Sequence, residues 1–214
     1  MNTGLLLVDI QNDYFPGGAM ELAQPEQAAR KAARLMKAFR EKGLPVFHVR
    51  HLSVGAGATF FLPDTEGAQI HASVQPLSGE NVIEKNFPNS FRETTLEGSL
   101  RQAAVTDVVI CGAMSHMCID ATTRAAADLG FTCTVVQDAC TTRDLEFAGR
   151  TIAAAEVHGA FMAALGAAYA QVLTGEEYLE EFYGPEPAYF LKPAPITIPS
   201  PKALIMPISM NRVL

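Results

Sequence analysis

Short apolar runs alternate with amphipathic segments along most of the chain. Apolar runs at residues 5–10, 45–51, 81–85, 107–113 and 132–137 predict five β-strands, and a weaker run at 170–173 predicts a sixth. Most of these runs are continuous in hydrophobicity, which is typical of parallel strands covered on both faces.

The segments between these runs have the period of amphipathic helices. The predicted helices cover residues 25–42, 96–104, 118–129 and 147–168, and residues 94–97 (TTLE) resemble a capping box. Gly43 and Gly130 stand where the first and third of these helices should end. This alternation predicts an α/β fold, a three-layer α/β/α sandwich around a doubly wound, mostly parallel sheet.

Two long loops and a proline-rich tail interrupt the pattern. Residues 11–24 and 53–79 are long enough to indicate substrate lids or subunit contacts. Residues 184–214 contain seven of the 13 prolines together with scattered apolar residues. We expect a single domain over residues 1–183, followed by an arm that is not an independent domain and that packs on a neighbouring subunit of a homo-oligomer, a dimer or a tetramer.

Composition narrows the class of protein. A hydrophobic content of 49% with 18% charged residues fits a compact globule, and a net charge of −7 argues against nucleic acid as a partner. The first apolar run is too short for a membrane span or a signal peptide, so we expect no membrane partner and a cytoplasmic location. In that reducing setting the four cysteines predict neither disulfides nor a structural zinc site.

Cys118 differs from the other three cysteines. The apolar run before it breaks at Gly112, and Cys118 follows where the helical pattern begins. Cys111 and Cys133 lie inside apolar runs and are expected to be buried core thiols. Because unpaired N–H groups and the positive end of a helix favour thiolate over thiol, this position indicates a nucleophile.

Two charged residues end other strands. Asp9 closes the first apolar run and Lys85 closes the third. Ligands bind at the carboxyl ends of the strands in an open parallel sheet, so we expect Asp9, Lys85 and Cys118 to meet at one edge. They would supply a proton shuttle, a positive partner and a nucleophile.

Three stretches carry a resemblance to a known family. Residues 6–15 (LLVDIQNDYF), 83–91 (IEKNFPNSF) and 112–120 (GAMSHMCID) resemble the isochorismatase-like hydrolases, in the cysteine-hydrolase branch with nicotinamidases and N-carbamoylsarcosine amidohydrolase. The resemblance implies six strands in the order 3-2-1-4-5-6. It also implies hydrolysis of a small amide or carbamoyl C–N bond through a thioester, with the substrate unknown.

The resemblance also implies roles for particular residues. Asp9, Lys85 and Cys118 match the catalytic triad, and a cis peptide bond is expected between Ala113 and Met114. The backbone N–H groups of Met114 and Cys118 would then form an oxyanion hole. The side chains expected to line the substrate pocket are those of Gln11, Phe15, Phe87 and His116, with core packing as the competing interpretation for the two phenylalanines.

The nicotinamidases of this branch hold a metal with an aspartate and two histidines near the second strand. Here that region offers His48 and His51, with His71 further along and no D-x-H pair. Three residues apart on a strand, His48 and His51 should point to opposite faces. We therefore expect no metal and no cofactor.

Three other functions compete with this hypothesis. The isochorismatase reaction, vinyl-ether hydrolysis without a covalent intermediate, is disfavoured because that branch typically lacks the cysteine. A dinucleotide-binding oxidoreductase is disfavoured because residues 10–13 (IQND) stand where a G-x-G-x-x-G sequence should follow the first strand. A non-catalytic binding or assembly protein that kept the fold stays open.

Overall fold

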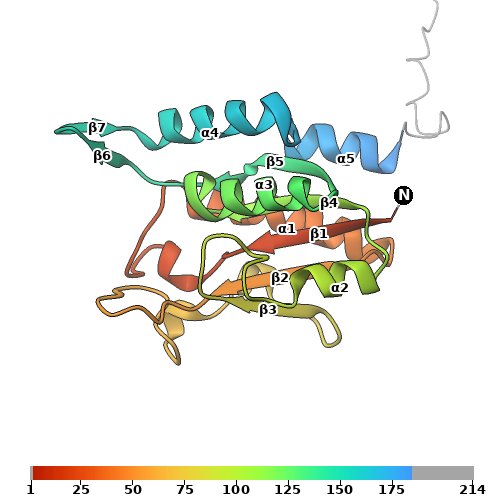
Figure 1. Cartoon of the computed structure of the whole chain (residues 1–214), viewed down its shortest axis with the longest axis horizontal. Helices are drawn as coiled ribbons and strands as arrows, with labels where there is room; N and C mark the ends of the chain where they lie inside the picture. The colour runs from red at the N-terminus through yellow and green to blue at the C-terminus, as the bar shows by residue number, and fades with distance from the viewer. Residues whose placement is uncertain (1, 185–214) are drawn as a thin grey trace, which may run out of the picture.

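The main sheet has six parallel strands between layers of helices (Figure 1). The structure is a computed structural model that describes residues 2–184. The strands follow the order β3-β2-β1-β4-β5-β8. Their bounds are β1 Thr3–Val8, β2 Val46–His51, β3 Asn81–Lys85, β4 Asp107–Ala113, β5 Thr132–Thr141 and β8 Gln171–Leu173. The predicted fold class and strand order are confirmed, with β8 as the sixth strand of the sheet.

Helices cover both faces of the sheet. They are α1 Pro25–Glu41, α2 Leu96–Gln102, α3 Asp120–Asp128, α4 Ala154–Ala168 and α5 Gly175–Tyr183. In Figure 1, α2 and α3 lie in front of the sheet and α1 lies behind it. Helix α5 contacts α1, and α4 contacts α3. None of the helices in the described part of the chain is long and apolar enough to cross a membrane.

The first helix shows how the sequence pattern produces this packing. Ala28, Ala32, Leu35 and Phe39 form one stripe of α1 and are buried against the sheet. Gly43 follows the helix with a φ of 64°, a backbone conformation that glycine adopts without steric cost. The amphipathic pattern of this segment therefore predicted both its buried face and its end.

The segment before α4 differs from the sequence prediction. A single helix was expected over residues 147–168, but β6 (Leu145–Phe147) and β7 (Arg150–Ile152) form a hairpin first. Its two-residue loop, Ala148-Gly149, has positive φ at both positions, as a type I′ hairpin turn requires. Alanine rarely adopts positive φ, so the Ala-rich composition concealed the turn.

Two smaller differences concern helix starts. The expected capping box at residues 94–97 does not form, because α2 begins one residue later than such a box requires, after Thr95, and the Thr94 hydroxyl donates to the Ser90 carbonyl at 2.6 Å. The helix expected to begin at Cys118 is preceded by a π-helical turn, Ser115–Ile119, in which Ile119 N–H donates to the Met114 carbonyl at 3.2 Å. Cys118 thus lies inside a wide turn rather than at the first position of α3.

Gly112 allows β4 to approach β1 at the point where both strands reach the site. A Cβ atom added at Gly112 would lie 1.9 Å from the Val8 carbonyl oxygen, and its φ of 126° disfavours any side chain. We expect Gly112→Ala to lower the free energy of unfolding by about 2–3 kcal/mol, measured by urea denaturation. Gly98→Ala in α2, where a Cβ meets nothing within 4 Å, is the control. It should be neutral or slightly stabilising.

The two long loops are ordered around one buried carboxylate. Asp13 accepts hydrogen bonds from the N–H groups of Ala19 at 3.1 Å and Phe61 at 2.6 Å. Gly67 packs so closely that a Cβ there would lie 2.1 Å from Asp13 Oδ1. Asp13 therefore fastens residues 11–24 to residues 53–79 beside the sheet edge. The predicted arm, residues 184–214, lies outside the described residues except for Gly184.

Candidate active site

Asp9 follows β1 in an unusual backbone conformation. Its φ is 52°, and its N–H donates to the Val49 carbonyl of β2 at 3.0 Å. Left-handed φ values are tolerated by aspartate better than by most residues, at a cost of about 1–3 kcal/mol when strained. The sharp change of direction after Val8 places the Asp9 side chain in the interior, where it is fully buried.

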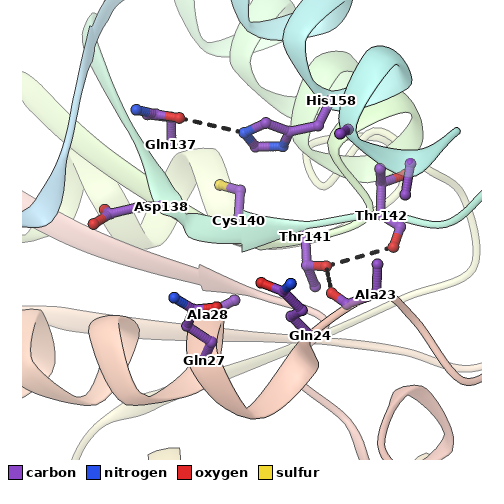
Figure 2. A pocket seen from close by; sticks show the side chains of 12 residues that line it. Ala23, Gln24, Gln27, Ala28, Gln137, Asp138, Cys140, Thr141, Thr142 and His158 are labelled. Carbon is purple, nitrogen blue, oxygen red and sulfur yellow. Dashed lines mark hydrogen bonds between the residues drawn. The ribbon is translucent and has the colours of Figure 1, made fainter.

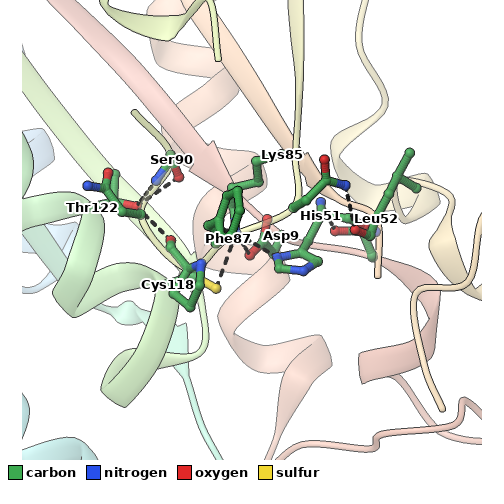
Figure 3. Close-up of polar contacts among 12 residues, drawn as sticks. Asp9, His51, Leu52, Lys85, Phe87, Ser90, Cys118 and Thr122 are labelled. Atoms are coloured by element: carbon green, nitrogen blue, oxygen red, sulfur yellow. Dashed lines mark hydrogen bonds and ion pairs between the residues drawn. The ribbon is translucent and has the colours of Figure 1, made fainter. Parts of the chain in front are cut away.

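Lys85 lies between Asp9 and Cys118 (Figure 3). Its Nζ is 2.8 Å from Asp9 Oδ2 and donates to Cys118 Sγ at 3.2 Å. The Asp9 and Lys85 side chains are 0% exposed, and Cys118 is 5% exposed. The structure thus brings together the three residues that the sequence placed at separate strand ends.

The charges of this cluster differ from the sequence expectation. Burial and the Asp9 carboxylate raise the pKa of the Cys118 thiol well above its ordinary value, although Lys85 acts in the opposite direction. Burial lowers the pKa of Lys85, but Asp9 and Cys118 outweigh burial and raise it above its usual value. The direction of this shift favours the thiol form of Cys118, whereas the sequence expectation of a helix start favoured the thiolate.

The turn before Cys118 contains the expected unusual peptide bond. The bond between Ala113 and Met114 is cis. Ser115, next along, is buried, and its hydroxyl contacts the Thr141 carbonyl at 3.1 Å and His158 Nδ1 at 2.8 Å. These contacts fasten the turn to the end of β5 and to α4.

Hydrogen bonds between Ser90 and Thr122, here called the Ser90–Thr122 tie, fix the loop after β3 against α3. Ser90 N–H donates to Thr122 Oγ1 at 3.1 Å, and the two hydroxyls are 2.7 Å apart. Both residues are fully buried. This tie holds the Phe87 segment beside Cys118, and the Phe87 carbonyl accepts a hydrogen bond from Lys85 Nζ at 3.1 Å (Figure 3).

The Gln11 side chain supports the backbone beside the site, whereas it was expected to line the substrate pocket. Its Nε2 donates to the His51 carbonyl at 2.9 Å and the Ala68 carbonyl at 2.8 Å, and its Oε1 accepts from His51 N–H at 2.8 Å. The side chain is fully buried. Because its amide already binds three backbone groups, we assign Gln11 to fixing the end of β2.

The other expected pocket residues lie around the cluster. Phe15 is buried and stacks on His71 with ring centroids 3.6 Å apart. The Phe87 ring lies under the Arg92 guanidinium at 3.6 Å. His116, half-buried, has its Nδ1 2.5 Å from Thr142 Oγ1. The aromatic faces of Phe15 and Phe87 are thus partly occupied within the chain.

The histidines considered as metal ligands have separate environments. His48 is buried with its Nε2 2.9 Å from Glu80 Oε2, and His71 stacks on Phe15. His51, for which no role was expected, has a ring nitrogen within 4.8 Å of a carboxylate oxygen of Asp9 and of the Cys118 sulfur. Lys85 Nζ lies among these three groups, so they enclose an ammonium and do not fit a metal ion. The position of His51 at the end of β2, in register with Lys85, was the signal that could have revealed it.

One cavity of the described chain lies apart from these residues. It measures about 280 Å³ and opens between the starts of α1 and α4 beside the end of β5 (Figure 2). Gln24, Gln27, Gln137 and His158 are among its lining residues, and none of Asp9, Lys85 or Cys118 is. A second cavity, of about 10 Å³, is lined by Asp9, Phe15 and Gly112 among others. The candidate site is assigned to the Asp9, Lys85 and Cys118 cluster because reactive groups converge there.

Comparison with known proteins decides the family. The family model of the isochorismatase domain matches residues 3–177, a range that contains Asp9, Lys85 and Cys118. The chain belongs to the isochorismatase family. Among its relatives, the isochorismatase family protein YddQ of Bacillus subtilis (strain 168) is 53% identical over 180 residues, which cover 84% of this chain and 100% of YddQ.

Other similar proteins include a solved structure and an amidase. A crystal structure of an isochorismatase-type hydrolase from Oleispira antarctica has 51% identity and a TM-score of 0.81, covering 86% of this chain and 97% of that one. N-carbamoylsarcosine amidase from an Arthrobacter species is 30% identical over 141 residues, which cover 58% of this chain and 53% of the amidase. The protein is therefore an isochorismatase-family hydrolase, and its relatives include an amidase.

Proposed function

We propose that this hydrolase cleaves a C–N bond of a small amide or carbamoyl compound through a thioester on Cys118. The observation that carries the proposal is the contact of Lys85 Nζ with both Asp9, at 2.8 Å, and Cys118, at 3.2 Å. In this buried cluster a carboxylate can take the proton of the thiol and an ammonium can balance the resulting charge, which is what acyl transfer to a cysteine needs. The similarity to an amidase supports the same bond class.

The chemistry follows from the protonation state of the cluster. Asp9 Oδ1, buried and without a hydrogen-bond partner among the described residues, accepts the thiol proton. The thiolate attacks the substrate carbonyl, and the N–H groups of Met114 and Cys118 stabilise the resulting oxyanion. Asp9 returns the proton to the departing nitrogen as the C–N bond breaks, and the thioester remains.

Water completes the cycle. Asp9 removes a proton from water, the hydroxide adds to the thioester, and the acid product leaves as Cys118 regains a proton from Asp9. Lys85 stays charged throughout and balances the negative charge as it moves between Asp9 and Cys118. The net reaction consumes one water and releases an amine or ammonia.

A screen for ammonia release tests this proposal. The purified protein should hydrolyse at least one member of a panel of primary amides and carbamoyl compounds. Mass spectrometry of the quenched reaction should find the acyl group on Cys118. A panel without turnover, together with no adduct on Cys118, would favour the alternative of a binding or assembly protein.

A further inference from the structure

Four acceptors surround the ammonium of Lys85. Its Nζ lies 2.8 Å from Asp9 Oδ2, 3.0 Å from His51 Nδ1, 3.1 Å from the Phe87 carbonyl and 3.2 Å from Cys118 Sγ. An ammonium has three N–H groups, so four acceptors compete for three hydrogens. The acceptors that receive an N–H of Lys85 decide how many of its N–H groups are left for the Cys118 sulfur and the Asp9 carboxylate.

His51 can accept from Lys85 only as a neutral ring with its proton on Nε2. Burial and the neighbouring Lys85 charge lower the pKa of His51, and the Asp9 carboxylate acts in the opposite direction. Lys85, Asp9 and Cys118 are the titratable groups that lie around the ring (Figure 3), and Phe61 packs beside it. The structure therefore favours one tautomer of a neutral imidazole.

The backbone of His51 is fixed independently of its ring. The Gln11 amide accepts from the His51 N–H and donates to the His51 carbonyl, at 2.8 and 2.9 Å. The loop that carries the Phe87 carbonyl is fixed three residues further along, where Ser90 is hydrogen-bonded to Thr122. Both the histidine and the carbonyl are thus anchored acceptors, whereas Asp9 and Cys118 are the groups that exchange a proton.

We propose that His51 is a positioning residue: its Nδ1 and the Phe87 carbonyl each hold one N–H of Lys85, which leaves the third N–H to be shared between Asp9 and Cys118. This inference rests on the proposed function. As the thiol proton moves from Cys118 to Asp9, the shared N–H turns from the neutralised carboxyl to the new thiolate. Lys85 remains an ammonium, His51 remains neutral, and the net charge of the four groups does not change.

Removing the Nδ1 acceptor should release a second N–H to the sulfur. In His51→Leu, Cys118 would gain a permanent hydrogen-bond donor, and the thiol would ionise more readily. We expect the midpoint of iodoacetamide labelling at Cys118 against pH to fall by about one unit, with labelling at pH 7 about tenfold faster. Asn carries an oxygen on Cγ where His carries Nδ1, so His51→Asn should stay within about threefold of the unchanged protein.

Peptide mass spectrometry measures labelling at Cys118 separately from the other cysteines, and NMR of ¹⁵N-labelled protein reports the His51 tautomer. We expect Nε2 protonated and Nδ1 bare at pH 7, with the signal assigned by its loss in His51→Asn. His71→Leu is the matched control and should leave the midpoint unchanged. The melting temperatures of all variants separate a loosened fold from a change at Lys85.

Several results would overturn the inference: an Nδ1-protonated His51, a midpoint in His51→Leu that is unchanged or raised, or a His51→Asn profile like that of His51→Leu. If His51→Leu does not fold, the tautomer and the His51→Asn profile decide the matter. None of these readouts needs a substrate. An unsuccessful amide screen would therefore reject the proposed function without altering the measured role of His51 toward Lys85.

Discussion

Cys118→Ala is expected to lower turnover of any amide or carbamoyl substrate by about 10⁴-fold or more, because the thioester has no other sulfur on which to form. Fold and stability should change little, since the thiol contributes a small buried side chain. The measurement is steady-state ammonia release with the best substrate of the screen. The removal of the nucleophile should also abolish the acyl adduct.

Cys133→Ala is the matched control for that experiment. Cys133 is likewise buried, but it lies on β5, and its Sγ contacts the backbone carbonyls of Thr123 and Phe131 rather than Lys85. Its turnover should remain within a few fold of the unchanged protein. Appreciable activity in Cys118→Ala would mean that the reaction proceeds without a covalent intermediate, as in vinyl-ether hydrolysis.

Lys85→Met is expected to cause the largest loss of stability, about 3–5 kcal/mol in the free energy of unfolding. It would leave the fully buried Asp9 carboxylate without its ion-pair partner. Because protonation of Asp9 removes its unpaired negative charge, the loss of stability should become smaller as pH falls. Urea denaturation at several pH values measures both effects.

Two further variants make the Lys85 experiment specific. Asp9→Asn combined with Lys85→Met removes both charges and should recover most of the lost stability. Lys37→Met, at an exposed lysine paired with Glu41 in α1, should change stability by no more than about 0.5 kcal/mol. If Lys85→Met were as harmless as Lys37→Met, the buried pair would not be a strong constraint on the fold.

The positions of the strands could be predicted because they follow from hydrophobicity along the chain. Parallel strands that end at one sheet edge were enough to predict that Asp9, Lys85 and Cys118 lie close together. The hairpin before α4 escaped prediction, because its turn has a positive φ at Ala148, a conformation that alanine rarely adopts.

The charge states of the site residues were less predictable than the identity of those residues. A helix start indicated a thiolate at Cys118, whereas burial beside Asp9 raises the pKa of the thiol. The contact of His51 with Lys85 depends on which way a ring at the end of β2 turns, and the role of Asp13 depends on two loops meeting. Charge states and loop contacts arise from distances in space, which residue spacing does not give.

The burial of Cys118 affects how its thiol reacts with oxidants. Cys118 is only 5% exposed, and burial raises the pKa of its thiol, so we expect it to react slowly with peroxide and with foreign disulfides, which require thiolate and access. The same burial limits which compounds reach the sulfur, so an alkylating agent or a substrate that reacts with Cys118 has to be small. One structural feature thus restricts both oxidative damage at this cysteine and the range of molecules that can react with it.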